Sequence, residues 1–78
     1  MMQINIEYTD TFSGEANYSW VKRSTVEMPE NATKRMILRR AKKEMQLSGT
    51  QGVTSKSGDM ISFKPYGSCT ILFVTFGG

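Results

Sequence analysis

The first third of the chain contains two stretches with strand character, separated by a polar segment. In residues 3–10, apolar side chains occupy every second position from Ile4 to Tyr8, which is the period of a half-buried strand. Residues 18–28 are rich in aromatic and β-branched types, which favour strands. Residues 11–17 between them contain glycine, serine and asparagine, which favour turns. We therefore expect a β-hairpin with its loop at residues 11–17.

The apolar period changes after Pro29, which ends the second strand. Asn31 is a suitable N-cap, and residues 32–47 follow the 3.6-residue period of a helix. Ser48-Gly49 supplies a C-terminal stop. One arc of about 100° on this helix is apolar, as in a helix that lies on a sheet. The arc consists of Ile37, Leu38, Ala41 and Met45.

The remainder predicts a loop and a second hairpin. Residues 49–59 are mostly Gly, Ser, Thr and Gln, which favour a loop with at most a short edge strand near Val53. Residues 61–64 alternate as a third strand, and residues 65–68 form a turn. Residues 69–76 are apolar on both faces, which is typical of a central strand.

The order of these elements predicts an α+β fold. We expect a ββαββ two-layer sandwich in which one helix packs on a mostly antiparallel sheet. The 78 residues are enough for a single domain, 1–78, with a small core. The other sheet face should be partly open, and parity leaves several aromatic residues there or in the core. These residues are Tyr18, Trp20, Phe63 and Phe73.

Composition excludes several kinds of active site. The chain has no histidine and one cysteine, so it lacks a Ser–His or Cys–His nucleophile system and a conventional zinc site. No Walker or Rossmann glycine pattern occurs. Cys69 follows the turn in an apolar run, where a buried thiol is expected. We therefore predict a binding protein rather than an enzyme, with no catalytic residues, metal or cofactor.

The same features predict a cytoplasmic location. The chain shows neither a signal-peptide pattern nor an apolar run long enough to span a membrane. A single cysteine also suits a reducing compartment. We expect no membrane association.

Basic residues are concentrated in the predicted helix. Six of the ten Lys and Arg lie in residues 34–43, and Glu44 can pair with them only through Arg40. This face can be a solvated surface, a contact for an acidic protein, or a contact for nucleic-acid phosphates. The solvated surface is the default interpretation of such a face. Among ligands, an acidic protein is favoured over a nucleic acid, because the chain has no RNP, KH or zinc-finger motif. The candidate binding residues are Arg35, Arg39, Lys42 and Lys43.

The first hairpin loop is a second candidate surface. Asp10, Phe12, Glu15 and Asn17 lie in or beside this loop, and further aromatic residues flank them. Polar groups framed by aromatic side chains are typical of recognition surfaces. The alternative is an ordinary hairpin whose aromatic residues fill the core, while Asp10 and Asn17 bond to the backbone.

Residues 8–21, YTDTFSGEANYSWV, and residues 58–67, GDMISFKPYG, resemble a group of small phage and prophage proteins of unassigned function. Small phage domains of this size often bind and block a host protein, and anti-CRISPR proteins are the best-known kind. The resemblance implies a phage-type accessory protein that binds a host macromolecule stoichiometrically in the host cytoplasm. That partner would be a host protein or complex, with a nucleic acid as the alternative.

A second resemblance concerns the element order and the ends of the chain. The order, the opening Met2-Gln3-Ile4 and the final Gly77-Gly78 resemble the β-grasp fold of ubiquitin and the sulfur carriers. In that family the terminal glycine carboxylate is activated and conjugated. Phe76 should end the sheet, which would leave a very short tail. A carrier is therefore the third functional alternative.

Overall fold

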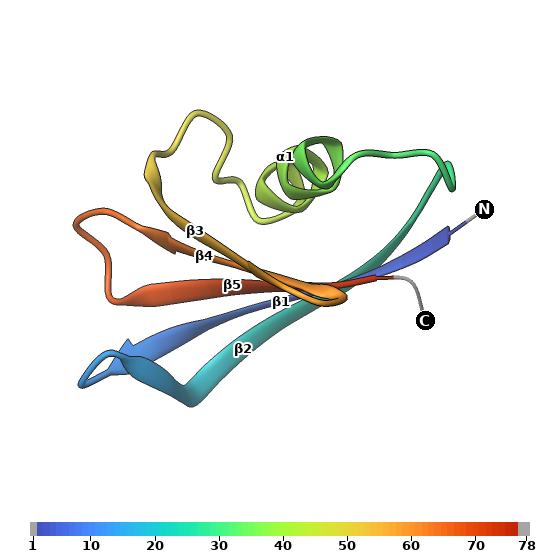
Figure 1. Ribbon diagram of the computed structural model, residues 1–78. Helices are drawn as coiled ribbons and strands as arrows, with labels where there is room; N and C mark the ends of the chain where they lie inside the picture. The colour runs from blue at the N-terminus through green and yellow to red at the C-terminus, as the bar shows by residue number, and fades with distance from the viewer. Residues whose placement is uncertain (1, 77–78) are drawn as a thin grey trace.

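The computed structural model describes residues 2–76, which form a five-stranded antiparallel sheet with one helix on one face (Figure 1). The strand order across the sheet is β2-β1-β5-β4-β3. This confirms the predicted α+β class and the packing of one helix on an antiparallel sheet. The elements are β1 (Met2–Phe12), β2 (Glu15–Met28), α1 (Lys34–Glu44), β3 (Gly52–Ser57), β4 (Met60–Pro65) and β5 (Thr70–Thr75).

The β1–β2 hairpin is tighter than its sequence predicts. Ser13 and Gly14 alone form the turn, with positive φ angles of 55° and 82°, as a type I′ turn requires. Phe12 pairs directly with Glu15. The predicted loop over residues 11–17 is therefore wrong, because most of it belongs to the two strands.

Helix α1 is shorter at both ends than its apolar pattern predicts. Its N-cap is Thr33, whose hydroxyl oxygen accepts the Met36 N–H at 3.2 Å, and not Asn31. At the other end, Gln46 adopts a left-handed conformation with φ 60°, which ends the helix before Ser48-Gly49. Within residues 2–76, no helix is long and apolar enough to cross a membrane.

The predicted loop over residues 49–59 contains strand β3, an edge strand at the place near Val53 where the sequence allowed a short one. The element order is therefore ββαβββ and not ββαββ. Gly58-Asp59 forms a two-residue turn into β4. All side chains from Val53 to Ser57 are exposed, so this strand has no buried face and no alternating apolar pattern. It is held instead by backbone pairing with β4.

The centre of the sheet departs from the β-grasp fold. Strand β5 lies between β1 and β4, as expected for a segment apolar on both faces. However, β1 and β5 pair antiparallel, whereas a β-grasp sheet places its first and last strands parallel. The resemblance to β-grasp proteins therefore does not extend to topology. Gly77-Gly78 lies outside the described residues.

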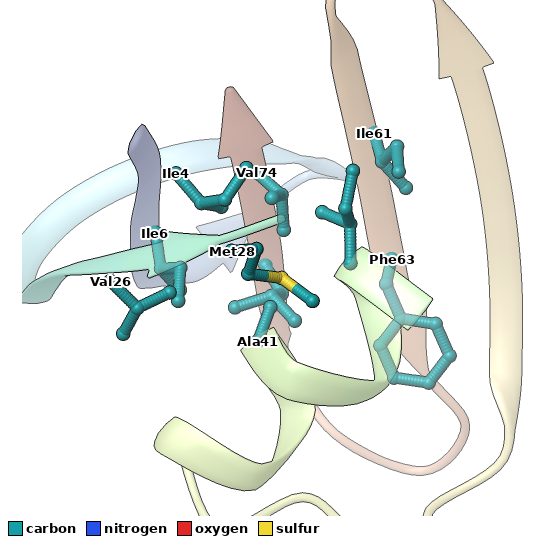
Figure 2. Close-up of a cluster of buried hydrophobic side chains, with 10 residues drawn as sticks. Ile4, Ile6, Val26, Met28, Ala41, Ile61, Phe63 and Val74 are labelled. Carbon is teal, nitrogen blue, oxygen red and sulfur yellow. The ribbon is translucent and has the colours of Figure 1, made fainter. Parts of the chain in front are cut away.

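The core lies between the sheet and α1 (Figure 2). Cross-strand partners Ile6, Val74 and Ile61 form one row across three strands, and α1 packs over β5. Burial of these apolar side chains is the main stabilising contribution to the fold. The core consists of Ile4, Ile6, Val26, Met28, Ile37, Ala41, Ile61, Phe63, Leu72 and Val74.

The four aromatic residues whose sheet face was left open by the sequence lie in different places. Phe63 is in the core, Phe73 is half-buried on the opposite sheet face, and Tyr18 is exposed. Trp20 packs edge-on against Tyr8, with 5.4 Å between ring centroids. Aromatic side chains are therefore divided between the core and the surface.

The prediction of a buried Cys69 is wrong. This thiol is exposed, because β5 begins one residue later and Cys69 belongs to the preceding turn. Its backbone carbonyl accepts the Thr11 N–H at 2.8 Å. The residue therefore contributes to the sheet through its backbone rather than its side chain.

Candidate functional site

A groove of about 820 Å³ lies along α1, with side chains of β3 on its other side. We call it the basic groove, because six of the residues that line it are Lys or Arg. Its basic residues are Lys34, Arg35, Arg39, Lys42, Lys43 and Lys56. Leu38, Ser48, Gly49 and Thr54 complete the lining.

The helical period explains why these side chains lie together. Residues four apart lie above one another on a helix, so residues 34, 38 and 42 form one row and residues 35, 39 and 43 form an adjacent row. Ile37 and Ala41 are buried against the sheet, which turns the two rows toward the groove. All four helix residues predicted as binding residues therefore line one site.

Lys56 was missed because its segment was interpreted as a loop. It pairs with Ile61 of β4, so its side chain lies on the same sheet face as α1. Thr54 is two residues earlier, on the same face. The signal that could have identified Lys56 is the Gly58-Asp59 dipeptide, which is suited to a tight hairpin turn.

Basic and acidic residues are unevenly distributed between the groove and the rest of the molecule. No Asp or Glu lines the groove, although the chain has seven acidic residues against ten basic ones. The ion pairs Arg23–Glu7 and Arg40–Glu44, at 3.0 and 2.9 Å, both lie outside the groove. The groove therefore carries a concentrated positive potential, while the rest of the chain has more acidic than basic residues.

Lys42 differs from the other cations of the groove. It is half-buried, and its ammonium donates to the Thr50 carbonyl oxygen at 2.7 Å. The same ammonium lies 4.6 Å from the centroid of the Phe63 ring, within the range of a cation–π interaction. Through these two contacts Lys42 connects the helix with the following loop and with β4. Lys42 therefore shapes the groove.

The exposed cations are the ones free to contact a ligand. Lys34, Arg35, Arg39, Lys43 and Lys56 are all exposed. Within residues 2–76, none of these five is in an ion pair. Their charges are screened only by solvent and counterions, so an anionic ligand can displace those counterions.

The hairpin residues Asp10 and Asn17 serve the hairpin itself. Residues 17–20 of β2 stand opposite the single residue Asp10. The Asp10 carboxylate accepts the Ser19 N–H at 3.0 Å, the Ser19 hydroxyl at 2.6 Å and the Asn17 amide at 3.0 Å. The Ser19 hydroxyl, followed by the Asn17 amide, lowers the pKa of Asp10 to about 2. This carboxylate holds the irregular part of the hairpin together.

Phe12 and Glu15 flank the hairpin turn and are exposed, with Phe12 at 73%. Figure 1 shows this turn at the end of the sheet, away from α1. The two predicted surfaces are therefore separate places on the molecule. Only the helical one lines a groove together with residues from another element.

The sheet face opposite α1 also carries charged groups, but they pair with each other. Glu7 accepts from Arg23 at 3.0 Å and from the Tyr18 hydroxyl at 2.8 Å. The hydrogen bond to Glu7 raises the pKa of Tyr18. A depression of about 420 Å³ on this face includes these three residues. Because its charges are balanced, this face offers less attraction to an ion than the basic groove does.

No family model, curated protein or solved structure matches the chain. Within residues 2–76, no group of three or more Cys, Asp or Glu could hold a metal ion.

Proposed function

We propose that this protein is a non-catalytic binding protein that captures an anionic macromolecule in the basic groove. The observation that carries the proposal is the set of six Lys and Arg in a lining without a carboxylate. Like charges four residues apart on a helix destabilise it slightly. A ligand of opposite charge removes this repulsion, and the field of the groove accelerates its association.

The resemblance to small phage proteins supplies a biological setting for this proposal. In that setting the chain is a phage-type accessory protein, and its ligand is a host protein or complex that it binds stoichiometrically. Blocking a host defence complex is one such role. The exposed positions of Arg35, Arg39 and Lys43 suit contact with a large partner, because they require no enclosed cavity.

Nucleic acid is the second candidate ligand of the same groove. Its support is that exposed cations on α1 and β3 could contact successive phosphates without reading sequence. However, the lining includes no aromatic residue on which bases could stack. Such binding would depend on phosphates alone.

A charge reversal with a matched control tests the proposal. Lys43→Glu reverses a charge in the groove, and Lys22→Glu makes the same change at an exposed position of β2 outside it. On a heparin column, a generic polyanion, we expect Lys43→Glu to elute at clearly lower salt than Lys22→Glu. Both should keep the wild-type melting temperature within a few degrees. Equal shifts in elution would show that only net charge matters, which would refute the groove as the site.

A further inference from the structure

Strand β3 is at the end of the sheet, and within residues 2–76 it pairs with β4 alone. The side chains from Val53 to Ser57 are all exposed. An edge strand of this kind presents unpaired N–H and C=O groups that can pair with another polypeptide. This edge adjoins the basic groove, because two residues of β3 line the groove.

The register shows which backbone groups of β3 point outward. Antiparallel partners alternate between pairs that exchange two hydrogen bonds and pairs that exchange none. Pro65 has no N–H, and the next residue, Tyr66, donates its N–H to the Gln51 carbonyl at 3.0 Å. The bonded positions of β3 are therefore odd-numbered. The N–H and C=O groups of Thr54 and Lys56 consequently point away from β4.

Thr54 and Lys56 thus combine two properties. Their side chains line the basic groove, and their main-chain groups are directed to the free edge. A polypeptide can satisfy both at once, by adding a strand to the edge and placing every second side chain on the groove side. Phosphate oxygens of a nucleic acid could accept from the two outward N–H groups, but they have no donor for the two outward C=O groups.

Charge also decides between an acidic partner and a second copy of the chain. Pairing two β3 edges would bring Lys56 and the basic rows of both copies together. A lysine on an edge strand is a common protection against such self-pairing. An acidic segment would instead be attracted, because its carboxylates would lie near the unpaired cations Arg39 and Lys43.

We infer that the ligand of the basic groove is an extended acidic polypeptide segment that adds to the edge of β3 as a sixth strand. This inference rests on the proposed function, because it names the ligand of the same groove. Its particular claim is main-chain pairing with Thr54 and Lys56.

Peptides of equal charge test this claim. The probe is a fluorescently labelled peptide of alternating Glu and Thr, about eight residues long to exceed β3 slightly. The control is the same peptide with every backbone nitrogen methylated, which keeps the carboxylates and removes the donors. In fluorescence anisotropy we expect the unmodified peptide to bind at least about tenfold more tightly. This is the effect of roughly two main-chain hydrogen bonds of ordinary net strength.

A second measurement does not depend on peptide geometry. In the free protein the Thr54 and Lys56 amides should exchange rapidly with solvent. Saturation with the Glu-Thr peptide should slow both by about tenfold or more, because each would become a ladder donor. Thr54→Pro removes one outward donor at an edge position where proline is tolerated. This variant should weaken binding of the Glu-Thr peptide by a larger factor than it weakens binding of heparin, because heparin forms no strand ladder with β3.

The outcomes separate this inference from the proposed function. If both peptides bind equally and Lys43→Glu weakens both, the groove binds anions but strand addition is refuted. If single-stranded oligothymidylate of matched charge binds more tightly than the Glu-Thr peptide, the ligand is a nucleic acid and the inference is refuted. If no polyanion binds at about 50 mM salt, both the inference and the proposed function are wrong.

Discussion

The attachment of α1 to the sheet gives the sharpest prediction about stability. Ile37 and Ala41 are the two helix residues that are buried, at 1% and 0% exposure. Replacing Ile37 with Ala leaves a cavity between the helix and the sheet. Because α1 carries most of the basic groove, the same change loosens the binding site.

The size of the effect follows from the burial. Truncation of a buried isoleucine to alanine costs about 2–5 kcal/mol of unfolding free energy. A chain of 78 residues has about 4–12 kcal/mol in total, at roughly 0.05–0.15 kcal/mol per residue. The substitution therefore removes a large share of the stability.

Urea unfolding followed by far-ultraviolet circular dichroism measures this effect. With an m value of about 1–2 kcal/mol/M, the midpoint should fall by roughly 1–5 M for Ile37→Ala. The control is Met36→Ala, one residue away and 44% exposed, which should change stability by less than about 0.5 kcal/mol. Equal midpoints for the two variants would refute the packing of α1 through Ile37.

Two further predictions concern the first hairpin. The stability contributed by ionised Asp10 is fully present above its ordinary pKa of 3.8 and is lost as pH falls through about 2. Thermal melts across this window should therefore fall more steeply for the wild type than for Asp10→Asn, and parallel curves would contradict the assignment. Ser13 adopts a positive φ of 55° before Gly14, so Ser13→Asn, which creates the Asn-Gly pair favoured in type I′ turns, should stabilise the protein by about 0.5 kcal/mol. A urea midpoint that is unchanged or lower would contradict this reasoning.

Strongly periodic segments were predictable from the sequence. The apolar arc over residues 32–47 correctly identified Ile37 and Ala41 as the residues that face the sheet. Once those positions are fixed, the helical period dictates that Arg39 and Lys43 lie on another side. One wall of the basic groove was therefore available from the sequence.

The side of the groove formed by β3 could not be predicted from the sequence, for a physical reason. Strand β3 has exposed side chains from Val53 to Ser57, so no hydrophobic pattern distinguishes it from a loop. Its conformation is set by hydrogen bonds to β4, which are a property of the tertiary structure. The local sign of this pairing is the Gly58-Asp59 turn, and the position of Lys56 in the groove follows only once that turn is taken as a hairpin.

The irregular register of the first hairpin could not be predicted from the sequence either. Local composition indicated a seven-residue loop, whereas Ser13-Gly14 makes the turn and Asp10 fills the irregular part of the ladder. Both Gly14 and Asn17 favour turns, so the sequence alone does not show which of them forms the turn. The outcome depends on cross-strand pairing, which places Phe12 opposite Glu15.

The central claim is that the basic groove is the binding surface of this protein. The most direct test is a backbone amide shift map recorded by NMR while a short heparin fragment is added. We expect the largest shifts at Arg39, Lys43 and Lys56, with little change at the hairpin tip. Largest shifts at Phe12 and Glu15, or small shifts spread evenly over the chain, would contradict it.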